Sequence, residues 1–130
     1  MTFEFATDVV IAKCAGELRM EDARQGASAL WGNPEWSGKP VVWDLRSAQL
    51  ELKRTDVELL ARFILGNQPA TPPPRVAFVT GRDVDFGLAR MFEVLREHRS
   101  TGIMVFRDHG EAVQWARELG RSGSSKPPGL

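Results

Sequence analysis

Three short apolar runs, each followed by a segment with helical periodicity, constrain the fold of this chain more than any other feature. The runs are Val41–Leu45, which holds one acid, Val76–Val79 and Ile103–Phe106. Nearly continuous apolar runs of this length are typical of strands that are buried on both faces of a sheet. Strands that alternate with amphipathic helices favour a largely parallel sheet covered by helices. The sequence therefore predicts an α/β protein.

Two more strands and four helices complete the prediction. Apolar residues around Phe3–Phe5 and Val9–Ile11 flank a polar Thr7-Asp8 pair, which is typical of a hairpin, and Gly16 is expected to end its second strand. Apolar stripes at helical spacing predict helices over about 21–31, 55–66, 88–95 and 112–119. The predicted order is ββαβαβαβα, a mixed, mostly parallel sheet of about five strands with about four helices.

The length and composition of the chain indicate one domain and exclude several classes of function. A chain of 130 residues fits one domain, predicted over 1–120, with a flexible Ser/Gly/Pro-rich tail over 121–130. Seventeen basic and seventeen acidic residues cancel, which disfavours a nucleic-acid partner. No apolar stretch approaches the length that spans a bilayer and no signal segment opens the chain, so stable membrane insertion is not expected and a cytoplasmic location is. The single cysteine, Cys14, excludes an intramolecular disulfide and is expected to be a small buried side chain.

The segment from Lys53 to Asp56 is the first candidate site. Thr55 is predicted to open a helix, either as an ordinary N-cap or as a phosphoacceptor. Arg46, Lys53 and Arg54 could pair with a phosphate there, or the helix start could bind an external anion, with Asp44 close by. These alternatives remain open on the sequence alone.

A second candidate site is an interaction surface formed by Trp36, Arg82 and Asp83. Trp36 lies in a loop flanked by Pro and Gly and is either exposed for contact or folded over the edge of the core. The loop over 81–87 lacks the glycine spacing of a nucleotide-binding loop, and its acids are expected to cap the following helix. The two histidines, His98 and His109, are too few and too far apart to indicate a metal site, and neither has a nucleophilic partner at a recognisable spacing. No metal, no cofactor and no enzymatic activity are predicted.

The element order, together with two stretches of sequence, resembles the STAS superfamily and its SpoIIAA-like group of bacterial proteins. The stretches are Gly16-Glu17-Leu18 followed by the strand Val41–Leu45, and the closing segment from Ala89 to Trp115. In the phosphorylated antagonists of that superfamily, an Asp ends the third strand and a Ser opens the next helix within Asp-Ser-Ser-Gly. Asp44 matches the strand Asp, but Thr55 is the only hydroxyl near the helix start. The resemblance therefore implies the fold without the serine phospho-switch.

Two functions follow as expectations. The leading hypothesis is a non-enzymatic, STAS-like regulatory module that binds a protein partner or a second copy of itself. Its surface would combine the loop after Asp44, the helix from Thr55 and the neighbouring Gly81 loop. The alternative is a carrier of a small apolar or lipid-like ligand, in a closed apolar pocket expected to be lined by Phe63, Phe86 and Phe92.

Overall fold

The computed structural model describes residues 1–95 and 101–118, and it confirms the predicted order of strands and helices. The strands are β1 (Thr2–Phe5), β2 (Val10–Leu18), β3 (Val41–Leu50), β4 (Arg75–Thr80) and β5 (Gly102–Phe106). The helices are α1 (Met20–Trp31), α2 (Arg54–Asn67), α3 (Asp83–Leu95) and α4 (His109–Arg117). The predicted tail over 121–130 and the predicted helix end at Gly120 lie outside the described residues.

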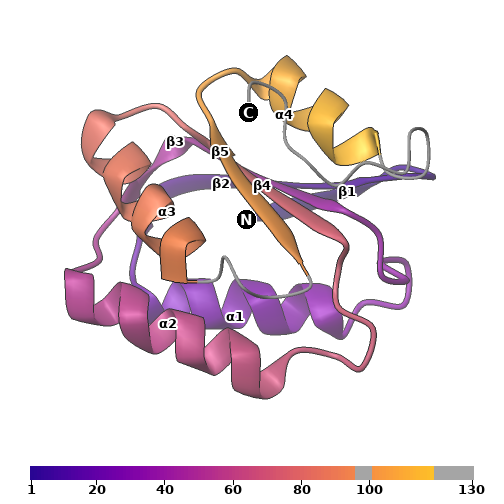
Figure 1. Ribbon diagram of the computed structural model, residues 1–130, viewed down its shortest axis with the longest axis horizontal. Helices are drawn as coiled ribbons and strands as arrows, with labels where there is room; N and C mark the ends of the chain where they lie inside the picture. The colour runs from indigo at the N-terminus through magenta and orange to yellow at the C-terminus, as the bar shows by residue number, and fades with distance from the viewer. Residues whose placement is uncertain (96–100, 119–130) are drawn as a thin grey trace.

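The five strands form one sheet in the order β1-β2-β3-β4-β5. Only β1 is antiparallel to its neighbour, and the other three pairings are parallel. The single sheet is therefore mixed and mostly parallel, as the hairpin and the β/α alternation predict. In Figure 1, α4 lies on one face of this sheet, and α1, α2 and α3 lie on the other.

Two strands are longer than the sequence pattern indicates. β2 continues through Gly16 to Leu18, and β3 continues five residues beyond Leu45. The registers Lys13↔Asp44 and Ala15↔Ser47 show that β3 holds one extra residue at this point. Such a bulge breaks the alternation of inward and outward side chains. The predictions that the two strands end at Gly16 and at Leu45 are therefore wrong. Gly16 lies inside β2, where it takes a positive φ of 79°.

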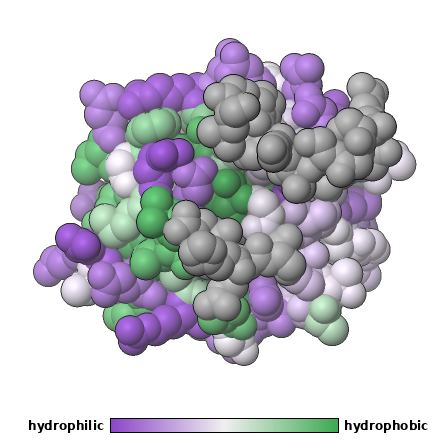
Figure 2. Space-filling view, in the orientation of Figure 1, coloured by the Kyte–Doolittle hydropathy of each residue, from purple (hydrophilic) through white to green (hydrophobic). Residues whose placement is uncertain are grey.

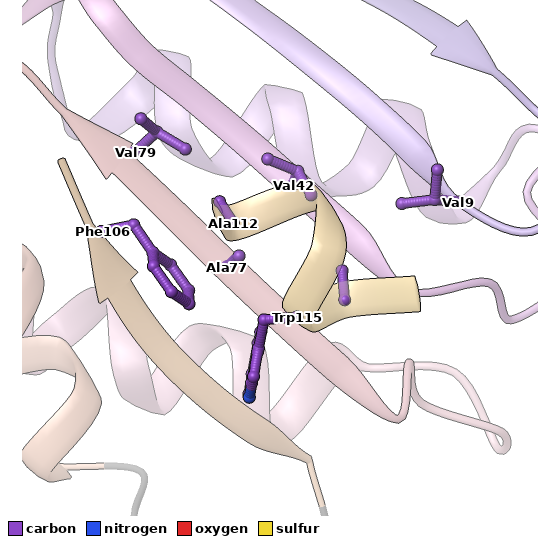
Figure 3. Packing of buried hydrophobic residues seen from close by; sticks show 8 residues of the cluster. Val9, Val42, Ala77, Val79, Phe106, Ala112 and Trp115 are labelled. Atoms are coloured by element: carbon purple, nitrogen blue, oxygen red, sulfur yellow. The ribbon is translucent and has the colours of Figure 1, made fainter. Parts of the chain in front are cut away.

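The face covered by α4 is a continuous apolar core. Figure 3 shows side chains of β3, β4 and β5 gathered beneath α4, where Ala112 and Trp115 pack on Val42, Ala77 and Val79. The rings of Phe106 and Trp115 are 5.7 Å apart. This side of the sheet is called the α4 face below.

The opposite face is covered by α1, α2 and α3 and is called the cavity face. Alternation along β3 assigns the residues: Val42 packs on the α4 face, whereas Val41, Trp43 and Leu45 point to the cavity face. The same alternation places Asp44 and Arg46 on the α4 face. One strand therefore supplies side chains to two separate environments.

Candidate functional site

An apolar cavity of about 150 Å³ lies between the cavity face and the three helices that cover it. Trp43 and Phe78 line it from the sheet, and Leu30, Leu60 and Phe92 line it from α1, α2 and α3 respectively. It lies near the surface beside Met1, which is half exposed and also lines it. A cavity of this size lined by apolar side chains is a dry site that accepts small apolar molecules.

Few polar groups line the cavity. Gln68 and Thr101 lie at the end where the parallel strands begin, and the hydroxyl of Thr101 donates to the carbonyl oxygen of Pro73 at 2.8 Å. Cys14 is the thiol in the wall, and burial raises its pKa to about 11. The expectation of a small buried cysteine is therefore confirmed, since a thiol of this pKa is almost entirely protonated near neutral pH.

The predicted aromatic lining is correct for one of three residues. Phe92 lines the cavity and packs edge to face on Phe78, with the ring centroids 5.6 Å apart. The ring of Phe63, on α2, stacks against Trp31 of α1 with the ring centroids 6.4 Å apart, and Phe86 lies beneath the guanidinium of Arg107 at 4.4 Å. Neither Phe63 nor Phe86 is part of the wall, because helical rotation turns both away from the sheet.

Asp44 and Arg46 of the predicted anion site form an ion pair on the α4 face, in which the carboxylate of Asp44 is buried and the side chain of Arg46 is 47% exposed. Nε and Nη2 of Arg46 donate to the two carboxylate oxygens of Asp44 at 2.9 and 2.8 Å. These hydrogen bonds lower the pKa of Asp44, although burial acts in the opposite direction. They also raise the pKa of Arg46. The carboxylate holds one edge of the guanidinium.

Thr55, Lys53 and Arg54 lie elsewhere, at the exposed start of α2. The N-cap is Lys53, whose backbone N–H donates to the carboxylate of Asp56 at 2.8 Å, so the predicted N-cap role of Thr55 is wrong. Arg54 lies within 3.8 Å of Glu58, one turn further along the helix. The acid at the third helical position thus accepts from the backbone N–H of the N-cap residue, which is one half of a capping box.

The structure does not bring Asp44 and Arg46 together with Thr55. Asp44 points to the α4 face, whereas α2 covers the cavity face. β3 runs for six residues beyond Asp44, to Leu50, a distance of about 20 Å along a strand. The predicted grouping of these residues into one anion site is therefore wrong, because β3 is longer than the sequence pattern indicates.

The loop after β4 lies beside β3, as predicted. A Cβ added at Gly81 would lie 3.1 Å from the carbonyl oxygen of Arg46. Arg82 is half exposed and forms two hydrogen bonds, of 2.9 and 2.8 Å, with the carboxylate of Asp85, which raise the pKa of Arg82. Asp83 is 92% exposed and pairs with Arg107 at 2.8 Å.

Trp36 does not contribute to an exposed surface. It is 5% exposed and packs with Val10, Leu30 and Val41. Its Nε1 donates to the carbonyl oxygen of Lys39 at 3.0 Å. The prediction that Trp36 shares an interaction surface with Arg82 and Asp83 is wrong, because the turn over 34–38 folds the indole over the edge of the core.

Sequence reasoning missed several polar groups that the fold buries, among them the carboxylate of Asp85, Oγ1 of Thr80 and Nδ1 of His109. Asp85 is fully buried, and Thr80 is 1% exposed with no hydrogen-bond partner for Oγ1 among residues 1–95 and 101–118. Nδ1 of His109 is buried 3.7 Å from the carboxylate of Asp44, again with no hydrogen-bond partner in the described part of the chain. His98 lies outside the described residues. The acidic start of α3 was the only sequence signal for any of these residues.

The described residues hold neither a cluster of metal ligands nor a membrane-spanning helix. No group of three or more His, Cys, Asp or Glu side chains is placed to hold a metal ion within residues 1–95 and 101–118. In the same residues, no helix has both the length and the apolar composition needed to cross a membrane.

Comparison with known proteins identifies the fold. No family model matches the chain, and no curated protein matches it. Among solved structures, it is similar to an uncharacterised protein of the DUF3478 family with a SpoIIAA-like fold, from Shewanella loihica PV-4. The match covers 88% of this chain and 90% of that chain, with 22% sequence identity and a TM-score of 0.52. The chain has a SpoIIAA-like α/β fold, and the resemblance seen in the sequence is confirmed at the level of the fold.

Proposed function

We propose that this protein is a non-enzymatic binding module that holds a small apolar ligand in the cavity between the sheet and α1, α2 and α3. The observation that carries the proposal is the cavity itself, with its volume of about 150 Å³ and its almost wholly apolar wall. An empty cavity of that volume costs roughly 4 kcal/mol of stability compared with a filled one. This is a large fraction of the 5–15 kcal/mol that stabilises a typical domain.

A ligand that fills the cavity restores the missing contacts, so binding and stability are coupled. The wall is built from three helices and four strands, so the volume is a property of the whole arrangement. Every helix on this face contributes: Leu30 from α1, Ile64 from α2 and Leu88 from α3 all line it. The ligand that fits is apolar and has roughly the size of benzene, the scale of molecule that a 150 Å³ cavity accepts.

Two measurements test this function. Native mass spectrometry of the purified protein is expected to show a co-purified apolar molecule. Added hexane or benzene is expected to raise the midpoint of thermal unfolding with increasing concentration, because both bind only the folded state. If no molecule co-purifies and neither hydrocarbon shifts the midpoint, the proposal is wrong.

A second candidate is the leading sequence hypothesis, a regulatory module that binds a protein partner or a second copy. It is favoured by large hydrophobic side chains that remain exposed on α2 and α3: Leu59, Leu65, Val84, Val94 and Leu95. Figure 2 shows hydrophobic residues gathered on the side of the molecule where α3 lies. Apolar side chains that gather on a surface are a usual mark of an interface.

Size-exclusion chromatography with light scattering tests the self-association form of this second candidate. A dimer that is lost on Leu59→Ser or Val94→Ser substitution supports it. A monomer at every concentration excludes a homodimer. Thr55 remains a predicted phosphoacceptor, exposed at the start of α2, and phosphosite mapping after incubation with a cognate kinase tests that prediction.

A further inference from the structure

The sheet is packed unequally on its two faces. On the α4 face, Val42, Ala77 and Val79 are fully buried. On the cavity face of the same two strands, Trp43 and Phe78 are only partly buried, although β3 and β4 are interior strands of the sheet. Protein interiors are normally close-packed. Both rings line the cavity, so the space left unfilled beneath the helices adjoins them.

Trp43 and Phe78 lie side by side. They are register partners on adjacent parallel strands, and neighbouring strands lie about 4.8 Å apart. Phe92 of α3 packs edge to face on Phe78, with the ring planes at 82°, and Trp31 of α1 also lines the cavity. Among the described residues, aromatic side chains therefore enter the wall from the sheet and from two of the helices, and Trp43 and Phe78 form the aromatic surface on the sheet.

The polar groups of the wall leave little basis for selecting a ligand by its hydrogen bonds. The hydroxyl of Thr101 already donates to the carbonyl oxygen of Pro73, and the thiol of Cys14 is a weak donor. Contacts between rings, by contrast, depend on the ligand as well as on the wall. Two aromatic rings that stack with an offset or meet edge to face attract one another beyond the effect of buried area, because their quadrupoles are complementary. A saturated ring lacks this contribution.

We propose that the cavity selects a small aromatic molecule over a saturated ring of the same carbon number, and that Trp43 and Phe78 determine this selection. This inference rests on the proposed function, since it names the chemical class of the apolar ligand. The surface that Trp43 and Phe78 leave accessible in the wall receives the bound ring. The edge-to-face contact of Phe92 with Phe78 is one that a ligand ring can also make with these side chains.

The test compares benzene with cyclohexane. Dissociation constants are measured by NMR titration of wild-type protein and of the Phe78→Leu variant, which keeps an apolar side chain and removes the ring. The measured quantity is the ratio of benzene affinity to cyclohexane affinity, compared between variant and wild type, so that the different hydration of the two hydrocarbons cancels. Phe78→Leu is expected to lower this ratio about fivefold. Trp43→Leu is expected to lower it in the same direction, and it provides the test if Phe78→Leu does not fold.

Ile103→Val is the matched control. Ile103 lies on β5, is partly buried and lines the cavity. The change removes a similar volume from the wall but leaves every ring in place, so the ratio is expected to stay within about twofold of the wild-type value. If Ile103→Val lowers the ratio as much as Phe78→Leu does, the selection depends on the size of the cavity and the assignment of the two rings is overturned.

The failures of the two proposals are distinguishable. If both hydrocarbons bind wild-type protein but Phe78→Leu and Trp43→Leu leave the ratio unchanged, the preference for an aromatic ligand is overturned and the apolar site stands. If neither hydrocarbon binds wild-type protein, the proposed function falls, and this inference falls with it.

Discussion

The carboxylate of Asp85 joins two elements that are far apart in the sequence. It is fully buried, and it accepts hydrogen bonds from Arg82 and from the backbone N–H of Leu50, 35 residues away. A buried carboxylate persists only where its oxygens are hydrogen bonded. Asp85 thereby fixes the end of β3 to the first turn of α3, where a negative charge also complements the helix dipole.

Replacing Asp85 tests this structural role. Asp85→Asn is expected to lower the free energy of unfolding by about 2 kcal/mol, because it removes charged hydrogen bonds in a buried position. Asp83→Asn is the control on the same turn, since Asp83 is 92% exposed. That change is expected to cost less than about 1 kcal/mol. Urea unfolding measures both, and equal losses for the two variants would contradict the assigned role of Asp85.

Asp44 makes stability depend on pH. Its pKa is lowered in the folded state by the hydrogen bonds from Arg46, so the unfolded state takes up a proton first as the pH falls. The stabilisation is therefore present above the unfolded pKa of about 4 and is lost as the pH falls through the lower folded pKa. Asp44→Asn is expected to destabilise the protein by about 1 kcal/mol at pH 7. Unfolding curves measured from pH 7 to pH 2 should show the difference from wild type shrinking below pH 4; a constant difference contradicts this account.

Single residues were predicted well where local sequence decides their role. Cys14 lies in an apolar strand and is buried there, as predicted. The contact between Asp44 and His109, by contrast, joins β3 to the start of α4, two elements that are far apart in the sequence. No local pattern encodes such a contact, because it depends on how elements distant in the chain pack.

At the scale of elements, the length of β3 explains why the predicted anion site differs from the structure. The sequence pattern predicts that the strand ends at Leu45, because Arg46 and Ser47 are consecutive polar residues. In the structure both are exposed, and alternation resumes with Ala48 buried. The extra residue in the register with β2 explains the interruption. A bulge is defined by how two strands pair, so the alternation of apolar and polar residues along one strand cannot reveal it.

Gly81, in the loop after β4, and Gly87, inside α3, are expected to respond oppositely to substitution by alanine. Gly81→Ala places a Cβ 3.1 Å from the backbone oxygen of Arg46, so it is expected to destabilise the protein by about 1 kcal/mol. Gly87 lies inside α3, and an added Cβ meets no atom of the described residues within 4 Å. Gly87→Ala is expected to stabilise by roughly 0.5–1 kcal/mol, because alanine favours helix. Thermal unfolding of both variants measures the two signs, and shifts in the same direction would contradict the close approach of Gly81 to β3.

At the scale of the whole molecule, the overall fold was predictable because every strand and helix carries its own periodicity. The β/α alternation fixed the parallel sheet and its helical layers, and the resemblance specified the fold group. An apolar cavity could be proposed from the sequence, but most of the residues that line it could not. Its wall depends on the rotation of each helix, which turned Phe92 inward and Phe63 and Phe86 away.

A larger side chain that fills the cavity is expected both to raise the stability of the protein and to abolish the binding of an apolar ligand. Ala27→Leu extends a buried side chain of α1 into the cavity and is expected to stabilise by about 1 kcal/mol. It is also expected to abolish the thermal shift caused by hexane. Ala29→Leu, an exposed position on the same helix, is the control, expected to change stability by less than about 0.5 kcal/mol and to keep the hexane response. Hexane binding by Ala27→Leu at wild-type affinity would contradict the location of the site.

The placement of the tryptophans makes the intrinsic fluorescence of the protein sensitive to the cavity. The chain has four tryptophans and no tyrosine, so its intrinsic fluorescence comes from indole rings. Trp31 and Trp43 line the cavity. Trp115, a residue of α4, is buried on the opposite face of the sheet, with the guanidinium of Arg75 4.8 Å from its ring centroid. Two of the four chromophores therefore face any ligand that enters, and the emission spectrum reports occupancy without an added label.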